Sequence, residues 1–60
     1  MIEELKAKLK RNRRSYKWFI ATYFQGYTYT YIMTQINGFA RMQENTKETI
    51  ENYLKEPDEV

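Results

Sequence analysis

The sequence contains no cysteine and no histidine, and it has only one serine, Ser15. The lack of cysteine excludes disulfide bonds. The lack of both residue types argues against a structural zinc site, whose ligands are mostly these two side chains. It also removes the usual nucleophile–base pairs of covalent catalysis. We therefore expect a non-enzymatic protein that needs no cofactor or metal and takes no small-molecule substrate.

Glycine and proline are scarce as well, with two glycines and one proline in 60 residues. Two isolated glycines cannot form a glycine-rich phosphate loop. The length allows a single domain, residues 1–60, and a chain this short buries only about 60% of the surface that its unfolded form exposes. Small domains without disulfides often gain stability by association. We therefore expect a homodimer.

Charge is absent from the 23 residues between Trp18 and Ala40. This run is long enough to cross a bilayer, but seven of its residues are Thr, Gln or Asn and two are Gly. A spanning helix needs about 20 predominantly apolar residues, and the charged N-terminus does not resemble a secretory signal. We expect no membrane contact and a cytoplasmic location, in the host cytoplasm if a phage encodes the chain.

The uncharged run is rich in aromatic and β-branched residues, which favour strands. Tyrosine and threonine alternate over residues 27–31, and period-2 alternation is typical of a strand. The pairs at 25–26 and 37–38 end in glycine, and Asn-Gly favours a two-residue hairpin turn. These features predict a three-stranded antiparallel meander with strands at 15–24, 27–36 and 39–43.

Both ends of the chain have helical patterns. In residues 2–11, Ile2, Leu5 and Leu9 lie on one stripe at helical spacing. Residues 46–55 form a second amphipathic segment, preceded by Asn45 with Glu48 three positions later, which suggests a capping box. Residues 57–60 follow as a tail. The predicted fold is therefore α+β: a helix, the meander and a second helix.

The hairpin register places the side chains of the meander on two faces. One face is strongly aromatic, and we expect the two helices to cover it. The other is mixed and stays uncovered in a monomer, so its apolar residues are candidates for a protein interface. These candidates are Phe19, Tyr23, Ile32, Ile36 and Phe39.

A second, all-helical interpretation comes from residues 15–54, which resemble the helix-turn-helix domains of phage repressors. Ile20-Ala21 matches the first motif helix, and 32–38 (IMTQING) resembles the end of a recognition helix followed by its Asn-Gly turn. The segment 49–55 is similar to the last helix. Gly26 lies one residue further from Ala21 than the family spacing, and Gln35 stands at an apolar core position. The resemblance implies an all-α fold.

Charged residues are segregated between the two ends of the chain. Seven cations and no acid lie between Lys6 and Lys17, whereas acids predominate from Glu44 onward. Clustered cations next to aromatic residues suit phosphates and bases. Nucleic-acid binding through this basic segment and the mixed sheet face is therefore our first functional hypothesis. The candidate residues are Lys6, Lys10, Arg11, Arg13, Arg14, Lys17 and Arg41. The alternative interpretation of the charges is that the two ends attract each other.

The second functional hypothesis is protein binding. Exposed aromatic residues, isoleucine and arginine are typical anchors of interfaces. A compact chain without a cofactor resembles, in size and style, the small accessory proteins with which phages block host enzymes or defence systems. In that case the protein is a stoichiometric inhibitor that occludes a surface of a host protein.

Overall fold

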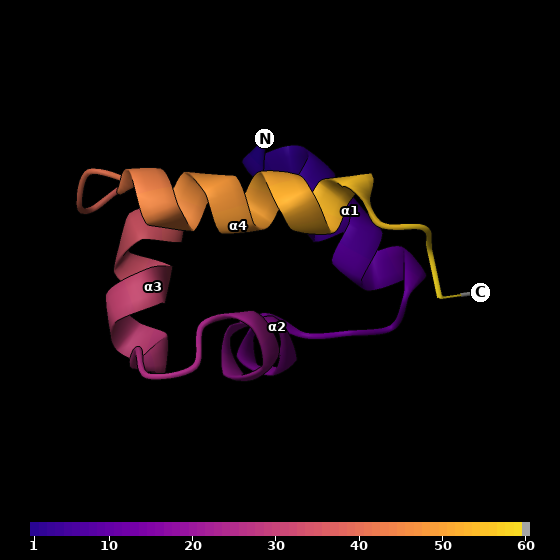
Figure 1. Ribbon diagram of the computed structural model, residues 1–60, viewed down its shortest axis with the longest axis horizontal. Coiled ribbons are helices and arrows are strands. Elements are labelled where there is room, and N and C mark those ends of the chain that lie inside the picture. The colour runs from indigo at the N-terminus through magenta and orange to yellow at the C-terminus, as the bar shows by residue number, and fades with distance from the viewer. Residues whose placement is uncertain (60) are drawn as a thin grey trace.

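The computed structural model describes residues 1–59, which form four α-helices. They are α1 (Ile2–Arg11), α2 (Tyr16–Tyr23), α3 (Tyr29–Ile36) and α4 (Glu44–Lys55). In Figure 1, α4 runs across the top and α2 is seen end-on below it. α3 stands upright at the left, below the start of α4. α1 packs against α4, and α2 packs against α3.

The predicted α+β fold is wrong, because residues 1–59 contain no strand. The segment 15–24 is mostly α2, 27–36 is mostly α3, and 39–43 belongs to the loop between α3 and α4. The all-helical class of the alternative interpretation agrees with the structure. Ile20-Ala21 lies in α2, and residues 32–36 end α3, as the resemblance to phage repressors implies.

Each of the two central helices begins with a hydroxyl side chain. Ser15 Oγ accepts a hydrogen bond from the backbone N–H of Trp18 at 3.1 Å, and Thr28 Oγ1 accepts one from Tyr31 at 3.1 Å. Serine and threonine are favoured at this position because they satisfy an N–H group that the first helical turn leaves free. The caps therefore set the starts of α2 and α3 inside segments that have strand-like composition.

Neither glycine closes a hairpin, because Gly38 ends α3 and Gly26 lies in the turn after α2. Gly38 has φ +84°, and the N–H groups of Gly38 and Phe39 donate to the carbonyls of Gln35 and Thr34. This pair of bonds is a Schellman motif, which favours glycine because its residue has positive φ. Gly26, at φ +93°, lies in the turn that Tyr27 N–H closes on the Phe24 carbonyl. Hairpin turns and helix ends both favour glycine, because both need a residue with positive φ.

The core lies between the four helices and is built from helical stripes. In α2 and α3 the buried residues recur at spacings of one, three or four, as they do on the inner face of a helix. Fully burying one such side chain stabilises the fold by about 1.5–3 kcal/mol. The buried hydrophobic residues are Leu5, Leu9, Phe19, Ile20, Phe24, Ile32, Ile36, Ile50 and Tyr53.

The two terminal helices occupy nearly the predicted ranges. α1 covers the same residues as the helix predicted at 2–11, whereas α4 begins two positions before the one predicted at 46–55. The expected capping box is absent, since Asn45 lies inside α4 and its side chain donates to Tyr27 Oη at 3.2 Å. The start of α4 is held by Gln35, whose Oε1 accepts from the Gln43 N–H at 2.9 Å.

Lysine 8 is a buried cation that joins the two terminal helices. Its side chain is 2% exposed, and Nζ donates to the carbonyls of Tyr53, at 2.7 Å, and Glu56. The ammonium also lies 4.7 Å from the centre of the Tyr53 ring. A cation at a helix C-terminus is favourable because the last carbonyls carry partial negative charge. Lys8 therefore fixes the end of α4 against α1.

Of the predicted tail, 57–60, the structure describes residues 57–59, which lie against the end of α1 (Figure 1). Asp58 and Glu59 pair with Arg11 and Arg14, while residue 60 lies outside the described residues. Within residues 1–59, no helix has the length and apolar character needed to cross a membrane.

Candidate nucleic-acid interface

Four of the seven predicted nucleic-acid-binding residues line one open groove of about 450 Å³. Lys6 and Lys10 come from α1, Arg14 from the loop after it, and Lys17 from the first turn of α2. Among residues 1–59 no acidic side chain is part of the lining, although Glu59 pairs with Arg14 at the edge of the groove. Like charges gathered in a concave surface attract polyanions more strongly than the same charges spread over the surface.

Two tyrosines also line this groove. Tyr16 is half-buried and Tyr29 is 47% exposed at the start of α3. Burial, and to a lesser extent Tyr29, raises the pKa of the Tyr16 phenol. The Tyr16 hydroxyl therefore stays a protonated donor at neutral pH, since phenols ordinarily titrate near pH 10. The groove thus combines cations with aromatic surfaces.

α3 presents an uncharged polar face beside the groove. Its sequence, YTYIMTQI, has no charged residue. Tyr29 and Tyr31 are each 47% exposed, as is Tyr27 in the preceding turn, and the rings of Tyr27 and Tyr31 stack with centres 5.8 Å apart. Thr30 is exposed as well. Hydroxyl groups both donate and accept, so these side chains can contact base edges as well as phosphates.

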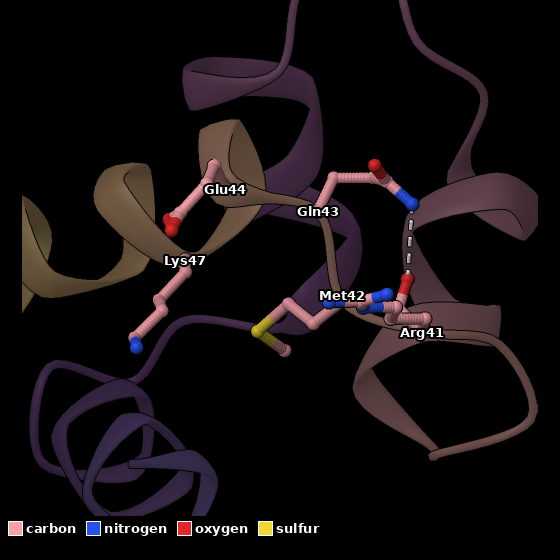
Figure 2. A pocket seen from close by; sticks show the side chains of 5 residues that line it. All are labelled: Arg41, Met42, Gln43, Glu44 and Lys47. Atoms are coloured by element: carbon pink, nitrogen blue, oxygen red, sulfur yellow. Dashed lines mark hydrogen bonds between the residues drawn. The ribbon is translucent and has the colours of Figure 1, made fainter.

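The other three predicted cations lie elsewhere. Arg11 pairs with Asp58, and Arg13 is exposed and is not part of the lining of the groove. Arg41 lines a separate hollow at the start of α4, which Figure 2 shows from close by. That hollow holds Lys47 but also the carboxylate of Glu44. Its mixed charge makes it a weaker site for an anion than the groove.

The predicted protein interface does not form a surface. Phe19 and Ile32 are 0% exposed, and Ile36 is buried with them in the core, so the mixed sheet face does not exist. Tyr23 is half-buried, and its hydroxyl donates to Glu56 at 3.0 Å. Phe39 alone of the five is fully accessible, at 84% exposure in the α3–α4 loop. The physical reason is the helical spacing, which turns Phe19, Ile32 and Ile36 inward.

The acidic tail holds two of the cations. Hydrogen bonds from the Arg11 guanidinium lower the pKa of Asp58, and those from Arg14 lower the pKa of Glu59. Groups whose pKa falls on folding stabilise the protein above their unfolded pKa, and this stabilisation is lost as the pH falls through the folded value. The ion pairs of the tail therefore stabilise the protein at neutral pH, and this stabilisation is lost in strongly acidic solution.

A pH experiment tests this contact. At pH 7 the double variant Asp58→Asn/Glu59→Gln is expected to melt slightly below the wild type, by roughly a few degrees or less for exposed pairs. The difference is expected to shrink as the pH falls from 7 towards 2.5, since the carboxyl groups of the wild type become protonated at their lowered folded pKa values. Thermal melts followed by circular dichroism measure it at both pH values. A difference as large at pH 2.5 as at pH 7 contradicts an ionic contribution.

No three acidic side chains among residues 1–59 gather as a metal site would require. Comparison of the chain with protein-family models, with curated proteins and with solved structures gives no match in any of the three.

Proposed function

We propose that this protein is a non-catalytic nucleic-acid-binding domain that uses the basic groove between α1, α2 and α3. The observation that carries the proposal is the groove itself, whose lining includes Lys6, Lys10, Lys17 and Arg14, the last of which is paired with Glu59. Cations at one groove can neutralise neighbouring phosphates and release their counterions, which is the main source of affinity in such complexes. Tyr16 and Tyr29 add hydroxyl donors and aromatic surface at the same place.

Duplex DNA is the form of nucleic acid that this arrangement favours. α2 and α3 are two short helices in contact, joined by a turn at residues 24–28, as in the helix-turn-helix domains that the sequence resembles. In such domains the second helix lies in the major groove while the first crosses the backbone. With α3 in that position, its tyrosine and threonine hydroxyls meet base edges, and Lys17 lies beside a phosphate.

A salt titration tests the proposal. Binding to a random duplex is expected to weaken linearly on a log–log plot of affinity against salt concentration, by about 0.9 in slope for each phosphate contact. Lys17→Gln is expected to reduce the slope by about 0.9, and Lys6→Gln/Lys10→Gln/Lys17→Gln by about 2.7. Fluorescence anisotropy with labelled DNA measures these slopes between low and moderate salt.

Lys55→Gln is the matched control, because it removes the same charge from a residue that is not part of the groove lining and should leave the slope unchanged. Equal effects of Lys17→Gln and Lys55→Gln would indicate a general charge effect and not a site at the groove. If wild-type protein shows no salt-dependent binding at low ionic strength, to duplex or single-stranded DNA, the proposal fails.

Protein binding is the second candidate, and the exposure of Phe39 favours it. A fully accessible phenylalanine in the α3–α4 loop is the kind of side chain that anchors an interface. If the protein is a stoichiometric inhibitor that binds through this loop, Phe39→Ser should abolish the inhibition, whereas Lys17→Gln should leave the inhibition unchanged. The homodimer loses its original support, since Phe19 and Ile32 lie in the core. Light scattering at several concentrations tests it.

A further inference from the structure

The acidic residues after α4 lie against the basic end of α1. Two oxygens of Asp58 accept hydrogen bonds from Arg11, at 3.1 and 3.4 Å, and two oxygens of Glu59 accept from Arg14, at 3.0 and 2.7 Å. Both pairs are bidentate, with the carboxylate facing two nitrogens of the guanidinium. Arginine binds phosphates with the same paired geometry.

Further contacts position this segment, so the pairing does not rest on side-chain charge alone. The backbone N–H of Glu59 donates to Asn12 Oδ1 at 3.0 Å, and the Glu56 carbonyl accepts from the buried Lys8. Arg14 is held from its other side, since its guanidinium carbon lies 4.4 Å from the centre of the Trp18 ring. The carboxylates are therefore presented to the two arginines by an ordered backbone.

Arg14 belongs to two sites at once. It is paired with Glu59, and it also lines the basic groove with Lys6, Lys10 and Lys17. The Glu59 carboxylate thus occupies a position at the edge of the groove where a phosphate would contact the same guanidinium. Asp58 pairs in the same way with Arg11, three residues earlier in the chain, which lies outside the lining of the groove.

We infer that Asp58 and Glu59 act as an intramolecular competitor, occupying phosphate positions on Arg11 and Arg14 until a nucleic-acid backbone displaces them. This inference rests on the proposed function, because it concerns regulation of the same groove. Both ion pairs are partly exposed, with side-chain exposures of 55% and 34% for Arg11 and Asp58. Such pairs are weak and screened by salt, so a polyanion can replace them. The lowered pKa values of both carboxyls agree with their being the charged form that occupies these positions.

Neutralising the tail tests the inference. The variant Asp58→Asn/Glu59→Gln is expected to bind a random DNA duplex more tightly than the wild type, by roughly three- to tenfold at low salt. The matched control is Glu48→Gln/Glu51→Gln, which removes the same two charges from exposed positions of α4. The control should gain clearly less affinity. Equal gains in both variants would show a net-charge effect and overturn the inference.

A second comparison tests whether the tail acts by occupying Arg11 and Arg14 or only by its negative charge at long range. Arg11→Gln/Arg14→Gln should weaken DNA binding strongly when the tail is neutral, because the freed arginines then contact phosphates. The same change should have less effect beside the wild-type tail. Identical losses in the two backgrounds would overturn the inference while leaving the proposed function intact. If none of these proteins binds DNA at low salt, the proposed function itself fails and the competition falls with it.

Discussion

Phe19→Ala is expected to destabilise the protein by about 3–5 kcal/mol, the range for removing a buried phenylalanine side chain. Phe19 is 0% exposed, and its ring centre lies 4.9 Å from that of Tyr53, 5.2 Å from Tyr23 and 5.6 Å from Phe24. Its removal leaves a cavity where α2 meets α4. Native domains are stable by only about 5–15 kcal/mol, so much of this variant should be unfolded at 37 °C. Urea unfolding followed by far-ultraviolet circular dichroism measures the change.

Phe39→Ala is the control for that experiment, since it makes the same substitution at a side chain that is 84% exposed. We expect a change within about 0.5 kcal/mol, as for other surface substitutions. The strand register placed both phenylalanines on one exposed face, whereas the helical fold puts one in the core and one in solvent. Similar effects at the two positions would therefore contradict the structure.

Lys8→Met is expected to cost about 1.5–3 kcal/mol, the range for a hydrogen bond to a charged group. Methionine keeps much of the volume of lysine but cannot donate to the carbonyls of Tyr53 and Glu56. The last turn of α4 then loses the cation that satisfies its free carbonyls. The same urea experiment measures the loss, and amide hydrogen exchange should speed up first near Tyr53.

Lys6→Met is the matched control, because Lys6 lies in the same helix but is exposed at the groove. The helix propensities of the two variants change equally, so the difference between them isolates the buried contacts. A loss at Lys8 no larger than the loss at Lys6 would show that the ammonium contributes nothing to stability at the end of α4.

The helical ends could be predicted because their patterns are unambiguous. Leu5 and Leu9 in α1, and Ile50 and Tyr53 in α4, lie at helical spacings between charged residues. The start of α4 was misplaced because Gln43 has no side-chain cap hydrogen bond. The hydrogen bond from Gln43 N–H to Gln35 replaces a cap, and a contact between separate segments leaves no local pattern in the sequence.

The prediction of strands in the uncharged run was wrong because its β-branched and aromatic composition favours strands, whereas its capping residues start helices. The tyrosine–threonine alternation spans only residues 27–31, and α3 begins at Tyr29, so part of it lies in a turn. Ser15 and Thr28 were available as N-cap candidates, and Ile32 and Ile36 as an i,i+4 pair. Asn37-Gly38 was ambiguous in principle, because a hairpin turn and a Schellman motif both favour glycine with positive φ.

The candidate site was predictable in charge but not in geometry. The basic segment contains Lys6, Lys10, Arg14 and Lys17, yet only the fold shows that these line one groove with Tyr29. The partial neutralisation of this segment by Asp58 and Glu59 agrees with the alternative that the two charged ends attract each other. Which arginines the tail would hold depends on how α1 and α4 pack, and sequence spacing does not give that.

The central claim is that a helical fold presents a basic groove and the start of α3 to nucleic acid. Titrating ¹⁵N-labelled protein with a short random DNA duplex, and following amide shifts by NMR, tests it most directly. The account predicts helical chemical shifts for 16–23 and 29–36, with the largest DNA-induced changes at Tyr16, Lys17 and Tyr29. Strand-like shifts over 27–36 would contradict the fold. Changes confined to the outer face of α4, around Glu48 and Glu51, would contradict the site.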